Sequence, residues 1–226
     1  MLNLRDKIRG YHGDVGEHDR SRSWEHCYRY FHKKTPEAIA EDRDHAALQL
    51  GFYLASWGMY RGSGFLLQYD YTIHLGVVNR LFTPEFSELW GRGQEFGGGD
   101  NDEALVPTIV EVCKAVREAY SCFGQASDIL VTKVILGTLG CLPAFDTYFE
   151  KGFKHERYKY SQLDAKVIEQ LLRFCGDNLN DLREEQARIE SKFQLRYPLM
   201  KLVDMCFHQI GFELDTKRGA GSFVGH

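Results

Sequence analysis

Two charged residues, Lys133 and Asp146, stand in the densest apolar stretch of the sequence, DILVTKVILGTLGCLPAFDTYF, residues 128–149. Lys133 interrupts a run that otherwise predicts a buried helix, and Asp146 follows a Gly-Cys-Leu-Pro break. Because an unpaired buried ammonium costs several kcal/mol, we expect Lys133 to find a partner, face a cleft or lie at the core's edge. Desolvation lowers the pKa of a lysine and can make its amine a nucleophile near neutral pH. A nearby carboxylate can stabilise a cation that develops during a reaction, so this pair is the candidate catalytic site.

A structural interpretation of the same pair remains open. Lys133 would extend its alkyl chain along apolar surface and hold its ammonium in water. Asp146 would cap or turn the helix that follows Pro143. The two interpretations differ in whether both side chains face one cleft, which is the observation that separates them.

Two further stretches carry residue types that can hold phosphates or bases. The corner WGMYRGS, residues 57–63, places Arg61 at a helix end, where it either caps its own last carbonyls or points across a cleft towards an acid or a phosphate. The connector KGFKHERYKYS, residues 151–161, mixes basic and aromatic residues as single-strand binders do. Its candidate nucleic-acid-binding residues are Lys151, Lys154, Arg157, Tyr158 and Lys159.

Aromatic and basic residues also alternate in the segment 21–34, which predicts an amphipathic helix. The spacing of Arg20 and His26 fits the loose arginine and histidine pattern of some helical ribonucleases, and an ordinary surface helix fits equally well. A patch around Trp24, Tyr28 and Trp57 would instead serve a non-enzymatic interaction module, such as an accessory or antitoxin-like protein.

Composition limits the function classes. The formal charge of -4 gives the whole molecule no field that attracts nucleic acid or acidic lipid, so any nucleic-acid contact would be local. No apolar window reaches the roughly 18 residues that a membrane helix needs, and the N-terminus lacks the apolar core of a signal peptide. We therefore expect a cytoplasmic protein with no membrane contact. The six cysteines lack metal-site spacing and are expected to be core side chains, and we expect neither a metal nor a cofactor.

The apolar spacing predicts an all-α fold of about ten helices, because capped segments of helical period recur and alternating strand patterns do not. The expected helices after a short amphipathic start are 21–34, 35–60, 72–82, 84–91, 107–123, 128–139, 143–151, 161–175, 178–193 and 197–212. The core should come from the stripe of the last helix, from 50–57 and from 134–139.

One domain over residues 1–215, with a flexible tail at 216–226, is the expected organisation. The glycine-rich run GRGQEFGGGDND predicts a flexible loop, and if the domain has two lobes they join near 91–106.

The stretch 126–149 resembles the helix-hairpin-helix DNA glycosylases, particularly the 8-oxoguanine glycosylase-like members. The likeness lies in Ser127, Lys133 and the Pro143-Ala144-Phe145-Asp146 element, and residues 201–211 resemble the closing helix of distant members. The resemblance implies that the lysine attacks the sugar C1′ and that the aspartate supports the charge that develops as the base leaves. The family's glycine-paired hairpin is replaced here by Cys122-Phe-Gly-Gln-Ala126, and the spacing from the lysine to the aspartate is shorter than in the well-known enzymes.

These observations support two main hypotheses. The first is a nucleic-acid-acting or nucleic-acid-binding protein, with DNA or RNA in a cleft lined by Lys133, Asp146, Arg61 and the connector. The second is a protein-protein interaction module, which the net charge favours. A third hypothesis is a helical ribonuclease that uses Arg20 and His26.

Overall fold

The computed structural model describes residues 2–13, 15–32 and 34–221, with side chains up to Lys217. As expected, these residues form an all-α fold, with eleven α-helices, four short 3-10 helices and no strand. The α-helices are α1 Leu4–His12, α2 Arg22–His32, α3 Pro36–Glu41, α4 Arg43–Ser56, α5 Leu75–Leu81, α6 Val106–Tyr120, α7 Asp128–Thr138, α8 Thr147–His155, α9 Ala165–Asp177, α10 Leu179–Phe193 and α11 Leu199–Gly221. The 3-10 helices are η1 Phe65–Gln68, η2 Tyr71–His74, η3 Pro84–Leu89 and η4 Asp102–Leu105.

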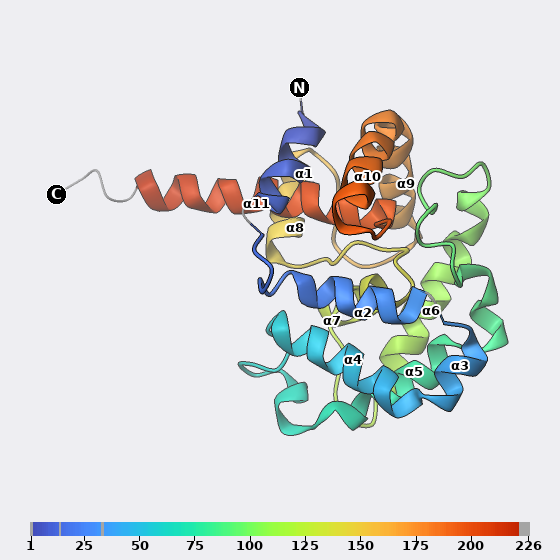
Figure 1. Cartoon of the computed structure of the whole chain (residues 1–226). Helices are drawn as coiled ribbons and strands as arrows, with labels where there is room; N and C mark the ends of the chain where they lie inside the picture. The colour runs from blue at the N-terminus through green and yellow to red at the C-terminus, as the bar shows by residue number, and fades with distance from the viewer. Residues whose placement is uncertain (1, 14, 33, 222–226) are drawn as a thin grey trace.

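Helix α11 organises the packing of the two ends of the chain. Helices α8 and α1 pack along it, while α2 and α4 pack on α7 and α5 packs on α6 (Figure 1). The C-terminal part of α11 projects away from the rest of the molecule (Figure 1). No helix in the described ranges combines the length and the apolar character needed to cross a membrane.

The core follows the stripes expected from the sequence. On α11 the buried residues include Leu199, Leu202, Val203, Cys206 and Ile210, each at most 5% exposed. The 50–57 segment contributes buried side chains up to its last turn, and the whole of 134–139 is buried. The α2 aromatic face is buried as well, which closes the core from the N-terminal side.

Helix boundaries differ from the expected ones at several places. The helix expected at 72–82 is divided into η2 and α5, the one expected at 84–91 is the 3-10 helix η3, and the one expected from 161 begins at Ala165. The single helix expected at 35–60 is broken at Asp42, whose carboxylate accepts hydrogen bonds from the Tyr30 hydroxyl and the Lys34 ammonium while its backbone leaves the helical region. The helix expected from Pro143 begins only at Thr147. Helix α11 continues to Gly221, so the first part of the expected tail is helical, and residues 222–226 lie outside the described residues.

The loop over 91–106 contains η4 and lies against the helices that follow it. Phe96 is buried, and the Gln186 side chain donates hydrogen bonds to the carbonyls of Gln94 and Tyr197. Buried residues on both sides of this loop belong to one continuous apolar cluster.

Five of the six cysteines are buried, as expected of core side chains. Cys122 is the exception and is exposed, because it lies in the turn between α6 and α7.

Candidate active site

Lys133 lies on α7, a helix that is buried almost all round. Ser127 caps the helix by accepting a hydrogen bond from the Leu130 amide, and every residue from Leu130 to Thr138 is buried. Lys133 itself is 4% exposed, so its ammonium does not reach water along the surface. The interpretation in which Lys133 extends to solvent is therefore wrong.

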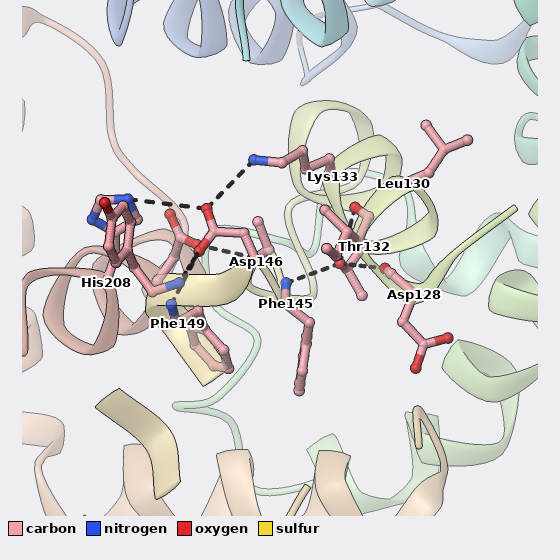
Figure 2. A network of polar contacts seen from close by, with 12 residues as sticks. Asp128, Leu130, Thr132, Lys133, Phe145, Asp146, Phe149 and His208 are labelled. Carbon is pink, nitrogen blue, oxygen red and sulfur yellow. Dashed lines mark hydrogen bonds and ion pairs between the residues drawn. The ribbon is translucent and has the colours of Figure 1, made fainter. Parts of the chain in front are cut away.

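Asp146 is the N-cap of α8 and also the partner of Lys133. Its Oδ1 accepts hydrogen bonds from the amides of Tyr148 and Phe149 at 3.1 and 3.0 Å. Its Oδ2 lies 3.6 Å from Lys133 Nζ and 4.0 Å from His208 Nε2, as Figure 2 shows. The capping expected in the structural interpretation is present, and the same carboxylate holds the lysine.

The loop before Asp146 is attached at two points, which explains why α8 starts late. The Ala144 amide donates to Asp204 Oδ1 at 3.0 Å, and the Phe145 amide donates to Thr132 Oγ1 at 2.9 Å (Figure 2). These amides would be free donors in the first turn of a helix that started at Pro143. Here they tie the loop to α11 and to the residue that precedes Lys133.

A close crossing of α8 and α11 brings α11 side chains to Asp146. A Cβ atom on Gly152 would lie 2.0 Å from the carbonyl oxygen of Phe207, and one on Gly211 would lie 1.9 Å from that of Tyr148. The two backbones therefore touch at glycines on both helices. This contact sets His208 beside the N-terminus of α8.

A second buried ion pair, which the candidate residues from the sequence do not include, stands in the same site. Lys201 Nζ lies 2.6 Å from Asp204 Oδ2, and both residues are 4% exposed. The ammonium of Lys201 lies 5.1 Å from the ring centres of Tyr11 and Trp24. Sequence signals for this pair exist, because Lys201, Asp204 and His208 recur at helical spacing within the otherwise apolar first part of α11, residues 199–208.

The two lysines have pKa values that move in opposite directions. Burial lowers the pKa of Lys133, and the charge of Lys201 adds to this effect, while Asp146 and Asp204 oppose it without cancelling it. Burial also acts to lower the pKa of Lys201, but the charge of Asp204 and the hydrogen bonds with Asp204 and Tyr11 outweigh it, so the pKa is raised. Lys133 is thus the amine that loses a proton more readily.

His208 and Tyr11 complete the set of titratable groups. Burial lowers the pKa of His208, against the opposing charges of Asp146 and Asp204. Burial raises the pKa of Tyr11 to about 12. Near neutral pH the imidazole is therefore neutral and the phenol keeps its proton.

The two ion pairs and His208 line one small cavity of about 10 Å³, which is room for roughly one water molecule. Its walls are Trp24, Tyr53, Trp57, Lys133, Leu136, Ala144, Asp146, Lys201, Asp204 and His208. Two lining side chains have a buried nitrogen with no hydrogen-bond partner in the described part of the chain, namely Trp57 Nε1 and His208 Nδ1. A buried polar atom without a partner is uncommon and marks a place where a ligand atom can bind.

Trp57 closes this cavity from the side of the glycine corner. Lys133 Nζ lies 4.8 Å from its ring centre, and the Arg20 guanidinium lies over the same ring at 5.4 Å. Arg61 is exposed and folds back on Gly58, since a Cβ there would meet Arg61 Nε at 2.8 Å. Arg61 is thus beside the residue that covers the cavity.

The basic connector does not line the cavity. Lys151 pairs with Asp215 at 2.6 Å, and Lys154 pairs with Glu150 on the same helix. Arg157 lines a separate groove together with His155 and with side chains of α1 and α11. The ring of Tyr158 stacks on Phe153, and Lys159 follows it in a segment held by Gln170. Lys151, Lys154 and Tyr158 are therefore used in contacts within the protein, while Arg157 and Lys159 are exposed away from the cavity.

One other expected surface, the exposed aromatic patch, is not formed. Trp24 and Tyr28 are 1% and 2% exposed, so the expected exposed aromatic patch is wrong: α2 packs on α4 and α7, and the Trp24 indole donates a hydrogen bond to the Leu136 carbonyl of α7. No described hydrogen bond or ion pair joins Arg20 to His26, which is exposed on α2.

No group of three or more His, Cys, Asp or Glu side chains in the described ranges is arranged to hold a metal ion. Comparison with known proteins finds no match among family models, curated proteins or solved structures. Any functional assignment therefore rests on the geometry and chemistry of this site.

Proposed function

We propose that the chain is an amine-nucleophile enzyme of the DNA glycosylase type, which acts on a nucleoside unit of a nucleic acid. The observation that carries the proposal is the Lys133 ammonium, buried on an apolar helix 3.6 Å from the Asp146 carboxylate. The lysine and the aspartate also follow each other along the chain as in the family that residues 126–149 resemble.

In the proposed reaction the neutral amine of Lys133 attacks the sugar C1′. The bond from C1′ to the base nitrogen breaks, and its electron pair leaves with the base. The carboxylate of Asp146 stabilises the positive charge that develops on the sugar, and it is already oriented by the two amides that it caps. The new ammonium nitrogen then loses a proton, and its lone pair forms the C1′=N bond as the C1′–O4′ bond breaks. O4′ leaves with that electron pair and takes up a proton, so the sugar opens and a protonated imine remains on Lys133.

The opposed pKa directions of the two lysines support this division of roles. When environments push the pKa values of two titratable groups apart, the groups can serve as base and as fixed charge at one pH. Lys133 supplies the amine, and Lys201 stays cationic beside Asp204. Aromatic rings around both ammoniums keep water away from the site.

The cavity is too small for a sugar and a base, so substrate must displace part of its wall. In our proposal the corner from Trp57 to Gly64 moves, because Trp57 covers the cavity and Gly58 and Gly62 have the positive φ values of 73° and 65° that suit a sharp turn. Arg61 lies on this corner and is then free to contact a phosphate of the strand.

Borohydride trapping tests the proposal. The protein is incubated with single-stranded and duplex oligonucleotides that carry an abasic site or 8-oxoguanine, and reduction converts any imine into a stable adduct. We expect an adduct with the full chain and none with Lys133→Met. Lys154→Met is the matched control, because this lysine is exposed and lies outside the cavity.

Two outcomes would contradict the proposal. One is the absence of an adduct with every oligonucleotide, and the other is an adduct of equal yield in Lys133→Met. Thermal unfolding of each variant shows whether a lost adduct reflects lost folding.

A protein-protein interaction module is the second candidate, favoured by an exposed apolar strip on α4. Leu48 and Phe52, one helical turn apart, are 45% and 57% exposed. Phe52→Ser and Leu48→Ser would abolish partner binding while leaving any trapped adduct intact. If the elution volume of the protein on size-exclusion chromatography is unchanged by every candidate partner, this role is contradicted.

A further inference from the structure

The imidazole of His208 is the remaining titratable group of the cavity whose role the proposed reaction leaves open. It lies on α11 with Nε2 4.0 Å from Asp146 Oδ2, the same oxygen that faces Lys133 Nζ at 3.6 Å (Figure 2). Its other nitrogen, Nδ1, is buried and has no hydrogen-bond partner in the described part of the chain. One carboxylate oxygen thus stands between the amine and the imidazole.

We propose that His208 is a catalytic residue that accepts the proton of the Lys133 ammonium through Asp146 and gives a proton to the leaving base from Nδ1. The inference rests on the proposed function. It adds a general acid and base to a site in which Lys133 is the nucleophile and Asp146 is the charge stabiliser.

The proton count closes with these groups alone. The Lys133 ammonium releases a proton to Asp146 Oδ2, which passes it to His208 Nε2, so that the imidazole becomes a cation with a proton on each nitrogen. As the neutral amine attacks C1′, the base leaves with the bonding electron pair. His208 Nδ1 then donates its proton to the base and returns to the neutral form.

The position of His208 suits this role for two reasons. In the neutral tautomer that carries its proton on Nδ1, which the proposed step uses, Nε2 and the carboxylate oxygen 4.0 Å away are both acceptors, and they form a hydrogen bond only when a proton comes between them. The unpartnered Nδ1 belongs to a side chain that lines the cavity, where a leaving group would stand.

Several neighbours hold the ring in place and set its charge. Tyr11 from α1 and Tyr148 from α8 each meet it edge-on, with ring centres 5.1 Å away. The charged groups that act on it are Asp146, Asp204, Lys201 and Lys133. In the proposed step the positive charge that the imidazole gains is the one that Lys133 loses, so the net charge of the cavity does not change.

The test measures the rate of adduct trapping against pH in the full chain and in His208→Gln and His208→Ala. General acid and base catalysis contributes typically 10²–10⁴-fold, so we expect the variants to be slower by about that factor near pH 7 while their affinity for the oligonucleotide changes less than about twofold. The full chain should show a flat rate between about pH 6 and 8. The variants should gain about tenfold per pH unit, because Lys133 must then lose its proton to bulk water.

Added imidazole supplies a readout that a merely structural role would not move. It should restore part of the rate in His208→Ala, where it can occupy the vacated space, and not in Lys133→Met. His26→Ala is the matched control, because this histidine is exposed on α2 and lies outside the cavity. Its rate and pH profile should equal those of the full chain.

The outcomes separate this inference from the proposed function. If the adduct forms through Lys133 but His208→Gln and His208→Ala keep the rate and the flat pH profile, the inference is wrong and the glycosylase-type function stands. If the full chain forms no adduct with any oligonucleotide, both are overturned. Slow variants with an unchanged pH slope and no rescue by imidazole would reduce His208 to a packing residue.

Discussion

Replacing Asp146 by asparagine separates the two roles of this side chain. Asparagine is as good an N-cap as aspartate, so the hydrogen bonds to the amides at the start of α8 should persist. Only the negative charge 3.6 Å from Lys133 Nζ is lost. We expect Asp146→Asn to destabilise the protein by about 2–4 kcal/mol near pH 7.

The magnitude follows from two limits. At an effective dielectric constant of about 20, two unit charges 3.6 Å apart attract each other by about 4–5 kcal/mol. Without the Asp146 charge, Lys133 can also release its proton, which removes the unpaired buried charge. With an ordinary pKa of 10.5, deprotonation at pH 7 costs about 5 kcal/mol at 1.36 kcal/mol per pH unit, which caps the destabilisation.

Removing the lysine of the pair, in Lys133→Met, should destabilise the protein much less than removing the aspartate charge. In Lys133→Met the carboxylate of Asp146 still accepts hydrogen bonds from two backbone amides and still interacts with the dipole of α8. Its side chain is 18% exposed. Methionine fills much the same volume as the lysine stem. We expect a change below about 1 kcal/mol, and a double variant close to Lys133→Met alone.

Urea unfolding of the parent, the two single variants and the double variant gives a double-mutant cycle. The free energies of unfolding are compared at a constant m-value. The pH dependence adds a check of sign. The folded pKa of Lys133 lies below its unfolded value, so between the two the unfolded chain binds more protons and stability rises with pH. Loss of the Asp146 charge lowers the folded pKa of Lys133 further, so the cost of Asp146→Asn should shrink as pH rises and Lys133 of the variant loses its proton before that of the parent. A cost below about 0.5 kcal/mol, or an equal cost in the Lys133→Met background, would refute the pairing as we describe it.

Three further predictions concern the framework of the site. Gly211→Ala should destabilise by about 1–3 kcal/mol or more, because its Cβ would lie 1.9 Å from the Tyr148 carbonyl oxygen; Gly176→Ala, whose Cβ would meet nothing within 4 Å, is the control and should be neutral or stabilising in a urea titration. Leu202→Ala should cost roughly 2–5 kcal/mol, and a melting temperature within a degree of the parent would remove α11 from the core. Burial lowers the pKa of His74 to about 4, so this residue's contribution to stability should be lost as pH falls from about 6.5 towards 4, by up to about 3 kcal/mol; a His74→Phe variant with the same acid limb would contradict this.

Most of the helices could be predicted because their signals are local. Ser127 before α7 and the apolar spacing of α11 act within a few residues, and both helices begin where these signals place them or within two residues of it. The late start of α8 could not be predicted. It depends on hydrogen bonds that backbone amides of the loop donate to Asp204 and Thr132, which are distant in sequence or on another helix.

The sequence by itself determined the all-α class, the apolar stripes and the two residues Lys133 and Asp146 as unusual, because each depends on residue type against its own neighbours. Only the tertiary structure decided that Lys201, Asp204 and His208 join them, that Trp57 covers the cavity and that Lys151 and Lys154 of the connector pair elsewhere. The reason is that ion-pair and ring contacts depend on where α11 crosses α8. That crossing is set by backbone contact at Gly152 and Gly211. Glycine contributes neither a charge nor an apolar side chain, so no sequence pattern predicts the contact.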